Sequence, residues 1–124
     1  MKLAVLTAGG VAPGMNAAVR AVAQKAFSLG WEVVGVEDGF GGILEERFSP
    51  IDRSRLGGLM HRGGTFLGSG RSKAVREKEG QERAAQRLEE EGIGGLVVIG
   101  GGGSLTSAKA LGEAGVEAMG YPPP

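Results

Sequence analysis

A chain of 124 residues is long enough for one domain with a real core, and its composition excludes several classes of protein. The 14 basic and 14 acidic side chains cancel, which argues against a nucleic-acid or anionic-membrane partner, since both usually require a basic excess. The sequence has no cysteine, no export signal and no apolar run of membrane-spanning length, so we expect a cytoplasmic protein without disulfides or thiolate metal sites.

The first part of the chain predicts two buried strands joined by a helix. A short apolar run at 2–7 lacks helical spacing and indicates a buried strand. After a glycine-rich loop, apolar residues at helical spacing predict a helix over 15–30 that ends at Gly30. A second strand follows at 31–38, and residues 43–51 fit either a small hairpin or an irregular excursion.

The middle of the chain holds two weak elements and one strong one. Glycines interrupt a weak helix at 53–61 and a short strand at 63–71. Residues 74–91 form the clearest helix of the sequence, with charges over most of its surface. Its predicted inner face consists of Ala84, Ala85 and Leu88.

The last elements complete an alternation of strands and helices. A third buried strand at 94–100 leads into a helix at 104–115 and a last strand at 116–121. This order predicts one α/β domain over 1–124, with a mostly parallel sheet of about four or five strands, the first strand central and helices on both faces. We expect an irregular tail at 121–124.

Two glycine-rich loops follow buried strands, at the end of a parallel sheet where ligands bind. The first, at 9–14, opens a helix, so its backbone N–H groups can approach an anion, but it matches neither a P-loop nor GxGxxG. The second, at 100–104, repeats the arrangement on the third buried strand. Three interpretations stay open: a nucleotide-phosphate site, a dinucleotide site with Glu37 or Asp38 on the ribose, and a structural turn with Ser104 as helix cap.

A pair of arginines brackets the glycine-rich strand within "MHRGGTFLGSGR". Arginine is planar, always charged and able to bind phosphate through two N–H groups at once. Arg62 and Arg71 are therefore candidate phosphate ligands, although a lone arginine more often forms a surface ion pair.

Three stretches of the sequence resemble a known family. "VLTAGGVAPGMNAAVRAV", "RGGTFLGSGR" and "LVVIGGGGSLTSA" are similar, in order and separation, to the N-terminal third of bacterial ATP-dependent 6-phosphofructokinase. The resemblance covers residues 2–121 and implies a Rossmann-like three-layer sandwich and allosteric tetramers. It also implies a glycolytic activity, transfer of the ATP γ-phosphoryl group to fructose 6-phosphate with Mg²⁺.

The resemblance implies roles for single residues around ATP or ADP. Gly10 would lie against the phosphates, Phe40 beside the nucleotide, and Arg71 on the bridging phosphates, where it would act in catalysis. The remaining nucleotide contacts would come from Gly101, Gly103 and Ser104, with Ser107 near the adenosine.

A second, regulatory site is implied between subunits. Arg20 and Arg53 match residues that bind an effector nucleotide or phosphoenolpyruvate. A further effector arginine of the family falls on Gln24 here, with Lys25 next to it. We expect a homo-oligomer with contacts near the first helix and Arg53.

The sequence departs from the family where the metal and the base are expected. Gly102 and Val11 stand where the family has aspartates, and the first of these holds Mg²⁺, so we expect no metal ligand in this loop. The family segment with the catalytic aspartate has no counterpart in "GYPPP" at the end of the sequence. The loop would keep its phosphate cradle without the chemistry, because phosphoryl transfer depends on metal-bridged charge and a placed base.

Three functions from different classes remain open. The chain can be a nucleotide-binding domain of the phosphofructokinase type with little or no activity alone, either as a fragment or as a truncated paralogue. It can be an active phosphotransferase whose missing half comes from a partner chain. It can also be a regulatory or structural module that binds ADP- or phosphoenolpyruvate-type phosphometabolites through its effector arginines.

Overall fold

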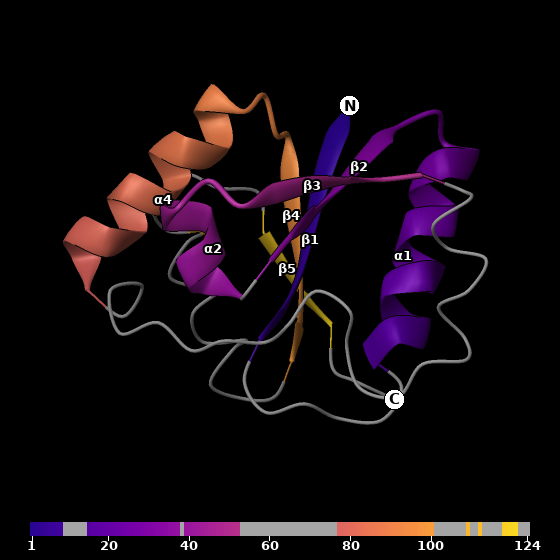
Figure 1. Ribbon diagram of the computed structural model, residues 1–124, viewed down its shortest axis with the longest axis horizontal. Helices are drawn as coiled ribbons and strands as arrows, with labels where there is room; N and C mark the ends of the chain where they lie inside the picture. The colour runs from indigo at the N-terminus through magenta and orange to yellow at the C-terminus, as the bar shows by residue number, and fades with distance from the viewer. Residues whose placement is uncertain are drawn as a thin grey trace.

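Five strands form a single sheet in the order β3-β2-β1-β4-β5, with β1 at its centre (Figure 1). The computed structural model describes residues 1–8, 15–37, 39–52, 77–100 and 118–121, together with Lys109 and Gly112. The strands are β1 (Lys2–Ala8), β2 (Glu32–Val36), β3 (Phe48–Ile51), β4 (Gly95–Gly100) and β5 (Ala118–Tyr121). The helices bounded within these ranges are α1 (Met15–Ser28), α2 (Phe40–Leu44) and α4 (Lys78–Glu90).

The central strand β1 is buried on both of its faces. Leu3, Ala4, Val5 and Leu6 are at most 8% exposed, so side chains that point in opposite directions are both covered. A continuous apolar run without alternation is typical of a parallel strand packed between two layers of helices. Strands β2, β1, β4 and β5 run parallel, and β3 runs antiparallel to β2 at one edge. The predicted mostly parallel α/β sandwich with a central first strand is confirmed.

One face of the sheet is covered by α1 (Figure 1). The buried side of this helix is made of small residues, which lets the helix approach the sheet closely: Ala18, Val19, Ala23 and Ala26. They pack against Leu3 and Val5 of β1 and against Val97 and Ile99 of β4. The side chains in this layer therefore come from segments far apart in the sequence.

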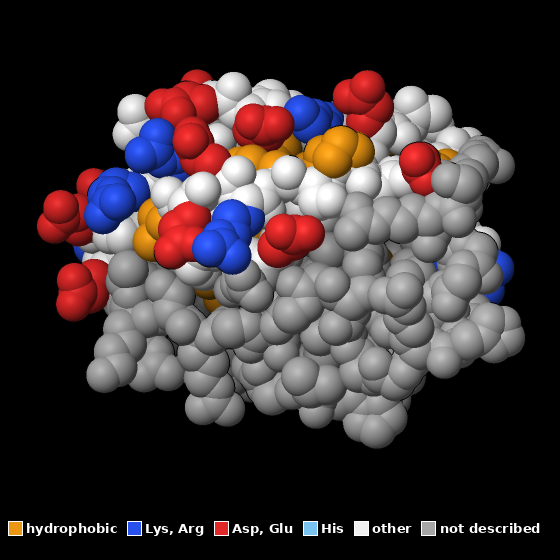
Figure 2. All heavy atoms as spheres, viewed as in Figure 1, with side chains coloured by type: hydrophobic (Ala, Val, Ile, Leu, Met, Phe, Trp, Pro, Cys, Tyr) orange, Lys and Arg blue, Asp and Glu red, His pale blue; other side chains and the backbone are white. Residues whose placement is uncertain are grey.

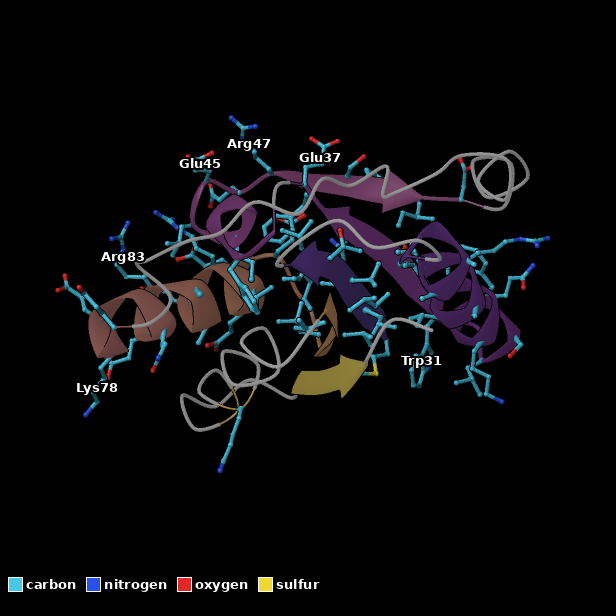
Figure 3. All side chains as sticks on the ribbon, turned by 90° about the horizontal axis from the view of Figure 1, so that it is seen from below. Trp31, Glu37, Glu45, Arg47, Lys78 and Arg83 are labelled. Atoms are coloured by element: carbon cyan, nitrogen blue, oxygen red, sulfur yellow. The ribbon has the colours of Figure 1, made fainter. Side chains whose placement is uncertain are left out.

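The opposite face is covered by α2 and α4 (Figure 1). Ala84 and Leu88 of α4 are at most 2% exposed, as the sequence predicted, while Ala85 is half-buried. Ile43 of α2 is fully buried in the same layer. The charged side chains of α4 point into solvent, as Figure 3 shows for Lys78 and Arg83.

Both α1 and α4 end at a glycine in the left-handed region, and both end in the same hydrogen-bond pattern. Gly30 has φ 77° and Gly92 has φ 78°. In each case the next residue donates its backbone N–H five residues back, from Trp31 to Ala26 and from Ile93 to Leu88, both at 3.0 Å. This is the Schellman arrangement, which satisfies carbonyl groups at a helix end. The predicted ends at these glycines are confirmed.

Three local predictions are wrong. Glu77 is extended (φ −98°, ψ 146°) and caps α4, so this helix begins later than the predicted start at 74. The short helix α2 was not predicted, because its sequence, FGGIL, has two glycines in five residues. Tyr121 is the last residue of β5, where the strand predicted at 116–121 also ends, so the predicted irregular tail does not begin at 121.

The remaining predicted elements fall mostly outside the described residues. These are the helix at 53–61, the strand at 63–71 and most of the helix at 104–115, of which Lys109 and Gly112 are helical. Within the ranges that the structure describes, no helix has the length and apolar character needed to cross a membrane.

Candidate functional site

The two glycine-rich loops leave the sheet side by side. Ala8 is the last residue of β1 and Gly100 the last of β4, and these two residues are partners in the parallel register. Gly10 follows Ala8 by two positions, and Gly101 follows Gly100 directly. The fold therefore starts both predicted phosphate loops from one point on the carboxyl edge of the sheet.

This point is also where the strand order reverses direction. From β1 the chain passes through α1 on one face to β2 on one side of β1. It reaches β4, on the other side of β1, from α4 on the opposite face. Such a switch point leaves a crevice at the carboxyl ends of the two central strands, which is where open α/β sheets bind ligands.

The end of β2 reaches the same edge and is shaped by close backbone contacts. Gly39, with φ 69° and ψ −148°, adopts a conformation that side chains do not permit and forms the N-cap of α2. A Cβ on Gly42 would overlap the carbonyl oxygen of Glu37. The backbone N–H of Arg47 donates to the carbonyl of Gly42 at 2.8 Å, and that of Glu37 donates to the carbonyl of Arg47 at 3.0 Å. Two glycines thus place α2 directly against the end of β2.

Phe40, the predicted nucleotide neighbour, lies at the start of α2. Its side chain is 5% exposed and packs in the core layer with Leu6, Val36 and Leu88. The ring therefore stabilises the fold, and only a small part of its surface remains for a ligand. Its contact with a nucleotide stays a prediction.

Glu37 carries a carboxylate at the carboxyl end of β2, on the side away from the switch point between β1 and β4 (Figure 3). It is half-buried and follows β2 directly, and it points toward the β3 side in Figure 3. Within the described ranges, the chain has no group of three His, Cys, Asp or Glu residues that could hold a metal ion. A single carboxylate can orient a hydroxyl group, but it does not complete a Mg²⁺ site, which needs several oxygen ligands.

Arg20, a predicted effector ligand, lies on α1. Its Nε atom is buried and has no hydrogen-bond partner among the described residues. A buried guanidinium nitrogen without an acceptor is costly, so the position favours an anion or another acceptor nearby. Gln24 and Lys25 follow on the same helix, and both are exposed.

The other predicted site residues lie outside the described residues. For the nucleotide they are Gly10, Arg71, Gly101, Gly103, Ser104 and Ser107, and for the effector Arg53; the metal-position residues Gly102 and Val11 are outside as well. What the structure brings together is the start of each nucleotide loop. Sequence reasoning missed the packed turn of Gly39 and Gly42, for which the signal was the cluster of glycines directly after a buried strand.

A parallel sheet with glycine loops at its switch point defines the class of open α/β proteins that bind ligands at the strand ends. The Phosphofructokinase family matches residues 2–123, and the chain belongs to this family.

Similar proteins agree in both sequence and structure. The chain is 50% identical over 121 residues to an ATP-dependent 6-phosphofructokinase of Vibrio cholerae, covering 98% of the chain and 38% of that relative. It is 48% identical to one of Streptococcus sanguinis, covering 98% of the chain and 36% of that relative. A solved structure of phosphofructokinase from Saccharomyces cerevisiae superposes with a TM-score of 0.87 at 32% identity, over 99% of this chain and 20% of that one.

One similar solved structure is named for a different phosphate donor. A solved pyrophosphate-dependent phosphofructokinase from Marinobacter aquaeolei superposes with a TM-score of 0.80 at 25% identity, over 98% of this chain and 33% of that one. The chain spans little more than a third of the length of the bacterial relatives named above.

Proposed function

We propose that these 124 residues form the nucleotide-phosphate-binding part of an ATP-dependent 6-phosphofructokinase, with little or no phosphoryl transfer by this polypeptide on its own. The observation that carries the proposal is the pairing of Ala8 with Gly100, because it starts both glycine loops at one switch point. Backbone N–H groups presented there would bind the phosphates of ATP or ADP. The high identity to relatives named as ATP-dependent supports ATP over pyrophosphate as the donor.

Arg71 is the side chain proposed to supplement the backbone donors. An arginine on the bridging phosphates neutralises charge and positions the transferred group, as catalysis of this reaction requires. Gly101, Gly103, Ser104 and Ser107 would complete the nucleotide contacts. We propose fructose 6-phosphate, the acceptor in the family reaction, as the substrate that would receive the phosphoryl group.

Neither Gly102 nor the described residues at the carboxyl edge provide the several oxygen ligands of a Mg²⁺ site. Gly102 offers no side-chain oxygen, and the described carboxyl edge supplies the single carboxylate of Glu37. Nucleotide binding should therefore depend little on Mg²⁺.

Calorimetric titration with ATP, with and without Mg²⁺, tests the binding site. We expect weak binding that changes little with Mg²⁺, and a loss of about tenfold in affinity for Arg71→Ala, since a charge-assisted hydrogen bond is removed. The matched control is Arg83→Ala, which removes an exposed arginine of α4 and should bind ATP like the unmodified chain. Equal losses in both variants would contradict the site.

A second variant separates binding from chemistry. Gly102→Asp should make ATP binding Mg²⁺-dependent without restoring formation of fructose 1,6-bisphosphate, because a general base contributes about 10²- to 10⁴-fold and would still be missing. Turnover by the unmodified chain that is lost in Arg71→Ala would overturn the proposal of inactivity and favour an active phosphotransferase.

A regulatory module is the second candidate, and the buried Nε of Arg20 favours it. In this alternative Arg20 and Arg53 bind ADP or phosphoenolpyruvate as an effector. Effector binding abolished by Arg20→Ala or Arg53→Ala, yet retained in Arg71→Ala, would support the module over the nucleotide-binding part. A homo-oligomeric state and a cytoplasmic location also stay predictions, and light scattering at high concentration tests the first.

A further inference from the structure

Thr7 is a buried polar residue near the end of the apolar strand β1. Among the described residues, it is the one polar or charged residue that is buried, with 0% of its surface exposed. The charged side chains of the described residues lie on the outside instead, as Figure 2 shows over α4 and the amino edge of the sheet. A side chain without exposed surface does not touch a ligand directly, so a role of Thr7 in binding would act through its neighbours.

The register of the sheet shows on which face the Thr7 hydroxyl lies. Side chains alternate along a strand, so Thr7 points to the same face as Val5, which packs in the layer of α1. Its register partner in β4 is Ile99, a member of the same layer. On the other side of β1, the register with β2 ends at the pair of Leu6 and Val36. Thr7 is therefore the first residue of β1 beyond the pairing with β2, just before the chain leaves the sheet.

The amino end of α1 lies at the same edge of the sheet as Thr7. The helix connects β1 to the parallel strand β2, so it runs antiparallel to both and begins, at Met15, near the carboxyl ends of the strands (Figure 1). The first four N–H groups of a helix have no carbonyl partner within the helix. A threonine hydroxyl both donates and accepts hydrogen bonds. Thr7 therefore lies on the face where the start of α1 and the glycine loop before it can use a side-chain partner.

Threonine is less favourable than valine at a position buried in this way. Valine has nearly the same shape, suits a strand equally well and matches the apolar neighbours Val5 and Ile99. A hydroxyl in such surroundings is unfavourable unless it is hydrogen-bonded. Among the described side chains, the buried polar atom without a hydrogen-bond partner is Nε of Arg20, whereas Thr7 has a partner. The backbones of β1 and β4 pair with each other beside it, so the position favours the backbone of the loop as the partner of the hydroxyl.

We propose that Thr7 is a positioning residue for nucleotide binding, whose hydroxyl hydrogen-bonds the backbone of the glycine loop at 9–14 and holds this loop in the conformation that binds phosphate. The inference rests on the proposed function, because it assumes that the loop binds the phosphates of a nucleotide. Backbone N–H groups bind an anion well when they already point toward it, so a hydrogen bond that fixes the loop lowers the entropy lost on binding. Thr7 acts from beneath the loop and leaves the surface of the loop to the ligand.

Two conservative variants separate the hydroxyl from the shape of the side chain. Thr7→Val keeps the shape and removes the hydroxyl, so it should weaken ATP binding about three- to tenfold, the weight of one neutral hydrogen bond, with a stability close to that of the unmodified chain. Thr7→Ser keeps the hydroxyl and removes a buried methyl group, so it should bind ATP like the unmodified chain although it is less stable. Calorimetric titration with ATP gives the affinities, and urea unfolding gives the stabilities.

Amide hydrogen exchange measures the effect on the loop without a ligand. Thr7→Val should speed up exchange at Gly9 and Gly10 relative to the unmodified chain, because local opening of the loop becomes easier. The control is the amide of Gly30 at the opposite edge of the sheet, which donates to the carbonyl of Phe27 at 3.0 Å and should exchange as before.

Three results would overturn the inference while leaving the proposed function intact. The first is an ATP affinity that Thr7→Val leaves unchanged, and the second is unchanged exchange at Gly9 and Gly10 in that variant. The third is weaker ATP binding by Thr7→Ser than by Thr7→Val, because a purely structural role makes the affinity follow the stability. Absence of ATP binding by the unmodified chain is a different failure, since it refutes the proposed function and the inference with it.

Discussion

Gly30 and Gly92, at the amino edge of the sheet, have open space around them, whereas a Cβ on Gly42, at the carboxyl edge, would overlap the backbone of Glu37. The first two glycines are needed for their positive φ, which ends α1 and α4. Gly42 is needed because another segment of the backbone lies where its side chain would be. Glycine is thus required for its positive φ at the amino edge of the sheet and for its lack of a side chain at the carboxyl edge.

The difference bears on where a ligand can bind. At the amino edge, side chains form the surface: the Lys2–Glu91 ion pair and the rings around Trp31. At the carboxyl edge, the backbone of β2 and α2 is packed closely and the two glycine loops begin at Ala8 and Gly100. Anions such as phosphates are bound well by exposed backbone N–H groups, so the carboxyl edge suits them.

The largest expected effect is at Gly42. Gly42→Ala should destabilise the fold by about 3 kcal/mol, because the new methyl group meets the backbone carbonyl of Glu37 and α2 must shift. Urea unfolding measures the change. Gly112→Ala is the matched control, since Gly112 is helical with nothing within 4 Å of an added Cβ, and it should stabilise by about 0.5–1 kcal/mol. Equal effects in the two variants would refute the close packing at Gly42.

The second-largest loss of stability is expected at the glycines that end α1 and α4. Gly30→Ala and Gly92→Ala should each cost about 1 kcal/mol, because alanine is strained at positive φ although no atom blocks it. The double variant should cost the sum of the two, because the sites share no partner. A cost as large as that of Gly42→Ala would remove the distinction between strain in φ and steric overlap.

At Glu46, in contrast, replacement by glycine should stabilise the fold. This residue has φ 57° without being glycine, and its carboxylate pairs with Arg87 Nη1 at 3.4 Å. Glu46→Gly should stabilise the fold by about 0.5 kcal/mol, since the relief of strain exceeds the weak exposed ion pair. Glu46→Gln removes the ion pair alone and should change the free energy of unfolding by less than about 0.5 kcal/mol. Marked destabilisation of the glycine variant would mean that the ion pair outweighs the strain.

The smallest effect is expected at the Lys2–Glu91 pair. Lys2→Met should lower the free energy of unfolding by at most about 0.5 kcal/mol, because both side chains are partly exposed. The loss should disappear at 1 M salt, where exposed charges are screened. A loss above about 2 kcal/mol would indicate that side chains stabilise the amino edge as strongly as glycine packing stabilises the other.

The sequence predicted the elements whose signal is local. A few residues are enough to predict each of these elements: the apolar runs of β1 and β4, the alanine-rich stripe of α1, and the helix ends at Gly30 and Gly92. Parallel order followed from the alternation of strands and helices. These features need no knowledge of distant contacts.

The sequence could not predict the elements that depend on contacts between distant segments. FGGIL has poor helix propensity, and α2 exists because it packs on α4 and on the end of β2. The sequence at 43–51 fits either a hairpin or an irregular segment, and the structure shows that β3 is an antiparallel edge strand on β2. For the site, the motifs identified the loops, while the register that makes Ala8 and Gly100 partners became visible only in the sheet.

The central position of β1 has a consequence for synthesis of the chain. Its partner β2 ends at Val36, but its other partner, β4, begins only at Gly95. At 5–20 residues per second a ribosome needs roughly 3–12 s to make the stretch between them. During that time one edge of β1, which is apolar from Leu3 to Leu6, lacks its native neighbour and is open to pairing with another chain. We expect the nascent protein to be most prone to aggregation, and most dependent on chaperones, in this interval.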